Sequence, residues 1–162
     1  MAADLTQTIT HDMPGDRLGH CVATCVAAFL DVPLSDVPHF VELGIYLARD
    51  KDDRIGWWAM MLGFMASRGY WPTQLDALSD ADPDETVFVS GQTVRGFPHQ
   101  CLYRAGELLF DPHPSRVGLT TVTEVVAWRK HSGFDHDPAS PIDDDEAREA
   151  FRALRGDLEE AS

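Results

Sequence analysis

Apolar residues recur at helical spacing in two segments of the first half of the chain. Residues 20–30 carry one stripe, made of Val22, Cys25, Val26, Phe29 and Leu30. The sequence Asp31-Val32-Pro33 ends that helix, because a residue before proline avoids helical geometry. Residues 57–68 repeat the pattern up to Gly69, with one face made of Trp58, Met61, Leu62 and Met65. We also expect a turn capped by Ser35 and a helix over residues 41–48.

The second half of the chain has a different pattern, typical of β-strands. Three strands are expected, over residues 86–90, 97–104 and 107–111, followed by one more helix over residues 123–130 that stops near Gly133. Helices gathered before strands predict the α+β class, with the helices of the amino-terminal half packed on a carboxy-terminal antiparallel sheet.

A break at Pro138, Ser140 and Pro141 separates an acidic tail from the rest. We expect residues 1–134 to form the main domain, with residues 135–162 as the tail. Ten acids and three arginines give the tail half of the net charge. Its apolar residues fall on one helical face, made of Ala147, Ala150, Phe151, Leu154 and Leu158. Two alternatives stay open for the tail, a docked amphipathic helix and a solvated segment.

Length and composition narrow the class of protein. The chain has 162 residues, and its 13 basic and 27 acidic residues give a net charge of −14. Such a surface repels phosphate, so neither nucleic acid nor an anionic membrane is expected as a partner. No apolar run is long enough for a membrane span, and no secretory signal is recognised. Three cysteines do not suit a disulfide framework, so we expect a cytoplasmic protein with free thiols.

Cys21 is the first candidate for chemistry. It lies at the start of the first predicted helix, where unpaired N–H groups and the positive end of the helix dipole stabilise a thiolate. Cys25 falls on the apolar stripe one turn later, which favours a core position. The alternative for Cys21 is an inert buried thiol, and this alternative stands unless another segment supplies a base.

A predicted hairpin over residues 97–111 supplies that base. A two-residue turn would force Ala105 to positive φ, so we expect a three-residue loop of Arg104, Ala105 and Gly106 with glycine alone in the left-handed region. This register pairs Tyr103 with Glu107, Cys101 with Leu109 and His99 with Asp111. Opposed residues share a face of the sheet, so His99 and Asp111 are expected to form a hydrogen bond.

Other histidines fit the role of base less well. His113 lies between two prolines, which predicts a rigid exposed turn. His39 and His11 have no carboxylate at a spacing that pairs with them, and His20 projects differently from its neighbour Cys21.

These motifs together resemble the papain-like cysteine peptidases. In that family a helix-initiating cysteine is followed by a strand histidine and then by an acid, which is the order found here. Within the family, the chain most resembles bacteriocin-processing (double-glycine leader) peptidases and small papain-like proteins of phages and bacteria. It rests on residues 19–25 (GHCVATC), residues 33–40 (PLSDVPHF), Trp57-Trp58, and His99 with residues 111–115 (DPHPS). The likeness spans about residues 5–120.

The resemblance implies Cys21 as nucleophile, His99 as general base and acid, and Asp111 as the orienting acid. Gln7 is the candidate for the oxyanion-binding glutamine of this family, although it lies fourteen residues before Cys21 instead of about six. His20 stands where the family often has Asn or Asp. Trp57 is the candidate for a residue lining the substrate cleft.

The expected activity is hydrolysis of a peptide or protein amide through a thioester, with no cofactor or metal. Three alternatives stay open: an acyltransferase or transglutaminase-like enzyme with the same triad, an inactive papain-like binding module, and a metal site. The binding module would use the acidic tail for a basic protein partner. The metal site would draw on the cysteines with His20, His99 and His113, but the spacing typical of zinc sites is absent.

Overall fold

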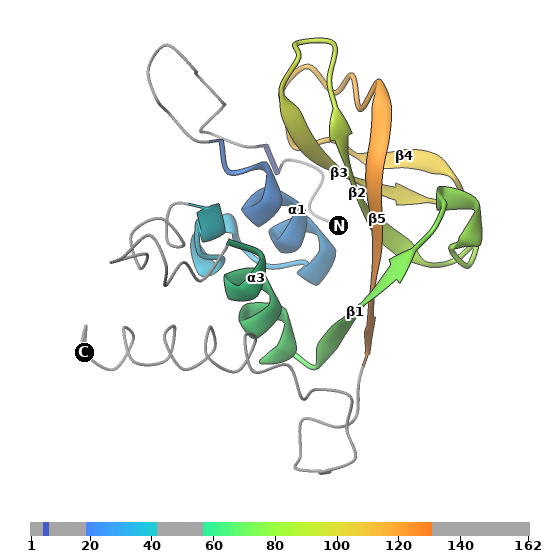
Figure 1. The fold of residues 1–162 in the computed structure, drawn as a ribbon. Helices are drawn as coiled ribbons and strands as arrows, with labels where there is room; N and C mark the ends of the chain where they lie inside the picture. Colours follow the sequence, from blue (N-terminus) through green and yellow to red (C-terminus); the bar gives the residue numbers. More distant parts are fainter. Residues whose placement is uncertain (1–4, 7–18, 42–56, 131–162) are drawn as a thin grey trace, which may run out of the picture. The chain divides into compact units, whose positions relative to one another are not determined.

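In the described part of the chain, two helices precede a five-stranded sheet (Figure 1). The computed structural model describes residues 5–6, 19–41 and 57–130. Helices α1 (Cys21–Leu30) and α3 (Trp57–Ala66) come first. The strands follow as β1 (Tyr70–Leu75), β2 (Thr86–Gln92), β3 (Pro98–Arg104), β4 (Glu107–Phe110) and β5 (Thr121–Lys130). Short 3₁₀ turns occupy Leu34–Asp36 and Leu78–Asp80. The predicted α+β class is confirmed.

The strands of the sheet lie in the order β1-β5-β2-β3-β4. Strand β2 pairs antiparallel with both β3 and β5, and β3 pairs antiparallel with β4. The pairing of β2 with β5 is interrupted between Ser90 and Gly91, where the register shifts. Gly91 lies there because a Cβ atom would come within 1.8 Å of the Thr121 carbonyl oxygen.

The chain forms two compact units. One comprises Met1–His39 and Thr73–Trp128, and the other comprises Phe40–Pro72 and Arg129–Ser162. Cys21, His99 and Asp111 all belong to the first unit. The predicted acidic tail, with its helix, and the predicted helix over residues 41–48 lie outside the described residues, except for Val41. In the described part of the chain, no helix combines the length and apolarity that a bilayer crossing requires.

Both faces of the central strands are covered. One face forms a core of Val87, Val89, Val125 and Ala127, against which Leu75, Leu78, Ala81, Tyr103 and Leu119 pack. On the other face the Phe88 ring meets Phe29 of α1 edge-on at 5.3 Å and Trp128 of β5 at 6.2 Å. This double coverage explains why the apolar run of β5 is continuous, as buried strands require.

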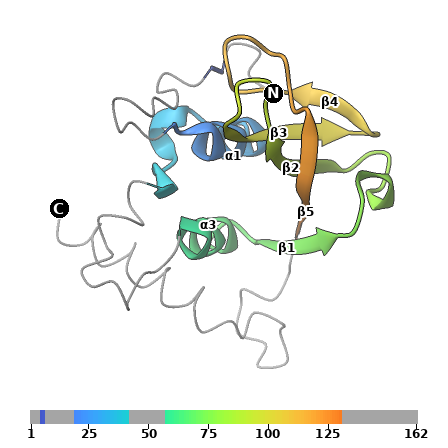
Figure 2. The same ribbon diagram turned by 45° about the horizontal axis from the view of Figure 1, so that its top comes forward.

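Helix α1 lies beside β3, as Figures 1 and 2 both show. Strand β4 pairs only with the last three residues of β3, Leu102–Arg104, so the earlier part of that edge is left uncovered. There the Cys25 thiol donates to the carbonyl oxygen of Gln100 at 3.3 Å. The hydrogen bond joins the candidate nucleophile's helix to the strand that carries His99.

The predicted helix over residues 123–130 is wrong, because this segment is strand β5. Its Thr and Val side chains favour a pleated strand, and its run of buried residues, Val125, Val126, Ala127 and Trp128, alternates between the two covered faces. Strand β1 was not expected from the sequence. Among the predicted strands, the boundaries of β2, β3 and β4 agree within two residues.

The two predicted helices over residues 20–30 and 57–68 exist, but each buries more than one stripe. In α1 every residue from Val22 to Ala28 is buried, whereas Phe29 and Leu30 are partly exposed. Asp31 ends the helix in the left-handed conformation with φ 57°. In α3 the buried residues include Met60 and Phe64 beside the predicted face, and Trp58 is only partly buried. Ser35 lies inside its 3₁₀ turn and does not cap it, since Pro33 holds that position.

Candidate active site

His99 and Asp111 form a buried pair at one end of the β3–β4 hairpin. The His99 Nε2 atom lies 2.7 Å from Asp111 Oδ1, and both side chains are almost fully buried. His99 is the second residue of β3, and Asp111 follows the last residue of β4. The predicted contact between these two residues is confirmed.

The hairpin achieves this contact by a route that differs from the prediction. Its turn has two central residues, Ala105 and Gly106, both at positive φ (52° and 78°), as in a type I′ turn. The register therefore pairs Arg104 with Glu107 and Tyr103 with Leu108. Continued unchanged, it would place Asp111 on the face opposite His99. The three-residue loop and its register are wrong.

A β-bulge returns Asp111 to the face of the sheet that carries His99. The register shifts between Tyr103 and Leu102, so that Leu102 pairs with Phe110 and Leu109 becomes the extra residue. Since a shift of one residue moves a side chain to the other face of a sheet, Asp111 returns to the face of His99 and Cys101. Ligand atoms of these three side chains lie within 4.8 Å of one another.

The Asp111 carboxylate is stabilised as an anion by its own loop. Oδ1 accepts the backbone N–H of His113 at 2.8 Å, and Oδ2 accepts that of Gly118 at 2.8 Å. Burial would raise the pKa of Asp111, but the hydrogen bonds from His99, Gly118 and His113 lower it to about 2. The loop is held in turn by Arg116, whose guanidinium donates to the carbonyl oxygens of Asp111 and Leu5. These bonds fix the position of the carboxylate.

His99 is held in its protonated form by its neighbours. Burial alone would lower its pKa, but the hydrogen bond with Asp111, and then those with Cys101 and Cys21, outweigh burial and raise the pKa to about 11. Because Nε2 is engaged by Asp111, the Nδ1 side of the ring is left to the thiols. The geometry matches an imidazolium braced by a carboxylate and facing sulfur.

Cys21 is the most accessible of the three thiols, all of which are free. It is partly exposed, whereas Cys25 and Cys101 are buried. Burial raises the pKa of both buried thiols, which keeps them protonated. Cys21 is also the first residue of α1, and the preceding residue His20 makes no side-chain cap hydrogen bond. The first N–H groups of a helix have no partner within it, so they remain available to an anion near Cys21.

The sequence also predicts Gln7 and Trp57 as site residues. Gln7 lies outside the described residues. Trp57 is partly buried and belongs to the second compact unit, so its role in lining a cleft stays a prediction. Of the rival histidines, His39 meets His20 edge-on at 5.7 Å, and His11 lies outside the described residues.

Several neighbours of the site were missed by sequence reasoning. Cys101 could have been found, since it lies two residues after His99 and therefore on the same face of the strand. Arg95, Ser115 and Gly118 carry no comparable signal, because their contacts with the site depend on the paths of two loops. His113 is not the exposed turn residue that was expected. It is partly buried, and its ring centroid lies 6.2 Å from that of His99.

The chemistry of the site has to be judged on these residues. Comparison of the chain with family models, with curated proteins and with solved structures finds no match in any of the three.

Proposed function

We propose that this protein is a papain-like cysteine hydrolase that cleaves amide bonds of peptide or protein substrates through Cys21, His99 and Asp111. One observation carries the proposal: a buried His99–Asp111 pair, joined by a 2.7 Å bond, lies close enough to a partly exposed cysteine at a helix start for Cys21 to raise the pKa of His99. Base, orienting acid and nucleophile come from three separate segments. The hydrogen-bonded chain of acid, imidazole and sulfur is the arrangement that activates nucleophiles in acyl transfer.

The reaction starts with transfer of the Cys21 proton to His99, whose protonated form is stabilised by the hydrogen bond with Asp111. The thiolate attacks the carbonyl carbon of the substrate, and the π electrons move to oxygen. The oxyanion is stabilised by backbone N–H groups at the start of α1, and the resemblance implies Gln7 as a further donor.

The leaving amine then takes the proton from His99. The C–N bond breaks, and an acyl thioester on Cys21 remains with a neutral His99. Neutral His99 takes a proton from water as the water attacks the thioester, and the C–S bond breaks to release the acid and the thiolate. Asp111 keeps its charge throughout, because three hydrogen bonds stabilise the anion.

Alkylation by iodoacetamide at about pH 6 tests this proposal. We expect Cys21 to react selectively, with the site identified by peptide mass mapping, because the thiolate form is held by protonated His99. Cys25 and Cys101 are the internal controls, since both are buried. His99→Ala should abolish the selectivity. Equal, slow labelling of all three cysteines would overturn the proposal.

A metal site is a second candidate, favoured by one observation. His99, Cys101 and Asp111 offer ligand atoms within 4.8 Å of one another. The direct bond between His99 Nε2 and Asp111 argues against both binding one ion, although a carboxylate can also orient a metal-bound histidine through its other nitrogen. Zinc content measured per chain separates the two candidates: one tightly held ion supports the metal site, and none supports the hydrolase.

A further inference from the structure

The loop between β2 and β3 carries a cation, Arg95, that is anchored by the loop after Asp111. Its Nη1 atom donates to His113 Nδ1 at 3.0 Å and to Ser115 Oγ at 3.0 Å. An Nη atom of arginine carries two hydrogens, so these two acceptors use both of them. The guanidinium is therefore fixed at one of its nitrogens.

The opposite edge of the guanidinium is left for another partner. Nε and Nη2 carry the remaining three hydrogens, and in the described part of the chain neither atom has an acceptor. No carboxylate of the described residues forms an ion pair with Arg95. The Nε–Nη2 edge is one that binds a carboxylate with two parallel hydrogen bonds.

The anchor of Arg95 is a neutral histidine. Nδ1 of His113 accepts from Arg95 and from the Ser115 backbone N–H at 3.1 Å, and both of these groups can only donate. The ring proton must then lie on Nε2. Burial and then the charge of Arg95 lower the pKa of His113, which agrees with this assignment. The cluster of Arg95, His113 and Ser115 therefore carries one positive charge.

This cluster adjoins the candidate active site. The His113 ring lies edge-on to the His99 ring with centroids 6.2 Å apart, and its backbone N–H donates to Asp111 Oδ1. One side chain thus separates the guanidinium from the imidazole that would transfer protons. Arg116 is a different case, because its guanidinium is occupied by backbone and side-chain oxygens of its own unit.

We propose that Arg95 is a specificity residue that binds a carboxylate of the peptide substrate through its Nε–Nη2 edge. The inference rests on the proposed function, and it names the substrate class: peptides with an acidic group close to the amide that is cleaved. The carboxylate has two sources, an Asp or Glu side chain and a free carboxyl terminus, and both offer the same two oxygens.

Paired alkylating peptides test the inference without a known substrate. Bromoacetyl-Gly-Glu-amide and bromoacetyl-Gly-Gln-amide differ by a side-chain carboxylate, and bromoacetyl-Gly-Gly as acid and as amide differ by the terminal one. The alkylation rate of Cys21 is followed by mass spectrometry. We expect the carboxylate member of at least one pair to react roughly tenfold faster, because a charge-assisted bidentate contact is worth about that factor. The pair that shows the preference identifies the source.

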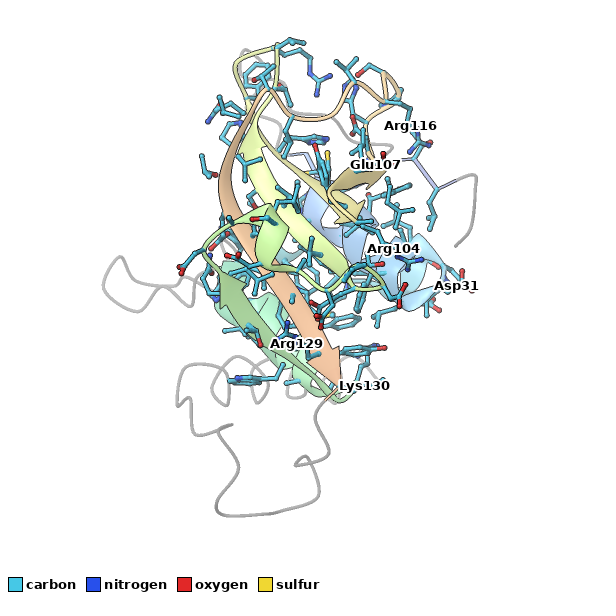
Figure 3. The ribbon with its side chains drawn as sticks, turned by 90° about the vertical axis from the view of Figure 1, so that its right-hand side faces the viewer. Asp31, Arg104, Glu107, Arg116, Arg129 and Lys130 are labelled. Atoms are coloured by element: carbon cyan, nitrogen blue, oxygen red, sulfur yellow. The ribbon has the colours of Figure 1, made fainter. Side chains whose placement is uncertain are left out.

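Three variants assign the preference to Arg95. In Arg95→Gln the ratio of the two rates should fall to about one, and in Arg95→Lys, which keeps the charge but loses the planar edge, it should fall part of the way. Arg104→Gln removes a charge elsewhere: Arg104 donates to Thr86 Oγ1 near the hairpin turn, and Figure 3 shows it apart from Arg116. The Arg104→Gln variant should keep the ratio of the two alkylation rates.

A failure of the proposed role of Arg95 and a failure of the proposed function give different results. Equal rates within both pairs, or a ratio that Arg95→Gln and Arg104→Gln lower alike, would overturn the role of Arg95 and leave the hydrolase intact. If neither member of any pair labels Cys21 selectively, the proposed function falls and this inference falls with it.

Discussion

His99 and Asp111 lie twelve residues apart on one hairpin, and a 2.7 Å bond joins Nε2 of the first to Oδ1 of the second. Both side chains are buried, so each depends on the other for its charge. The acid is bound more fully than the base, because two backbone N–H groups of its own loop also donate to it. Loss of the acid would therefore leave three donors without an acceptor.

Asp111→Ala is expected to destabilise the protein by about 3–5 kcal/mol, since it leaves a buried partner of an ion pair uncompensated. Urea unfolding measures this loss. Asp84→Ala is the matched control: Asp84 is exposed, so its loss should change the free energy of unfolding by less than about 0.5 kcal/mol. Similar losses in the two variants would mean that the buried pair contributes little.

The pair also predicts how stability depends on pH. The pKa of His99 is raised from 6.5 to about 11, so its contribution is complete below about pH 6.5 and is lost as pH rises towards 11. The pKa of Asp111 is lowered from 3.8 to about 2, so its contribution is complete above about pH 4 and is lost as pH falls towards 2. Stability from the pair should be greatest between about pH 4 and 6.5.

The alkaline limb is the sharper test between pH 7 and 8, because the raised pKa values of the Cys25 and Cys101 thiols add a similar loss of stability only from about pH 8.5 upward. Between pH 7 and 8 the free energy of unfolding should fall by up to about 1.4 kcal/mol owing to one proton on His99. In His99→Gln that slope should disappear. Parallel curves for the wild type and the variant would show that His99 is not held protonated.

Gly91→Ala should be more damaging than an ordinary glycine substitution. The new Cβ would lie 1.8 Å from the Thr121 carbonyl oxygen, so β5 must move away from β2. We expect a loss of about 1–3 kcal/mol or more in thermal or urea unfolding. Gly96→Ala is the control, since φ there is +78° and nothing lies within 4 Å of a Cβ atom, which leaves only the left-handed strain. A larger loss at Gly96 would contradict the described contact.

The turn of the β3–β4 hairpin offers a stabilising change. Ala105 has φ 52° in a position where asparagine and glycine are favoured. Ala105→Asn should raise the free energy of unfolding by about 0.5–1 kcal/mol, because it relieves left-handed strain of about 1–2 kcal/mol in part. Ala105→Val should lower it. Should the valine variant match the wild type in urea unfolding, the turn does not hold Ala105 at positive φ.

Elements with a clear period could be predicted, and those set by tertiary neighbours could not. The apolar spacing of α1 and α3 and the alternation in β3 are local signals, and both gave the right type of element. The segment Thr121–Lys130 has no such period, because both of its faces are covered, and only its pairing with β2 makes it a strand. Strand β1 likewise is a strand because it pairs within the sheet, beside β5.

The candidate site shows the same limit. The contact between His99 and Asp111 was predicted from a three-residue loop that the hairpin does not have, and a bulge restores the shared face that the observed two-residue turn would remove. The turn and the bulge could not be predicted, because the strain at Ala105 is offset by pairing elsewhere in the hairpin. Arg95 was missed for a further reason: its contacts with His113 and Ser115 lie 18 and 20 residues away and join two loops.

The Cys25–Gln100 hydrogen bond has a mechanical consequence for the proposed reaction. Cys25 is one helical turn from Cys21, and Gln100 is the residue after His99. The helix and the strand are therefore joined within one turn and one residue of the two side chains that exchange a proton in the proposed reaction. Sliding of α1 along β3 would have to break this hydrogen bond, so the bond helps to hold the separation between the Cys21 sulfur and the His99 ring.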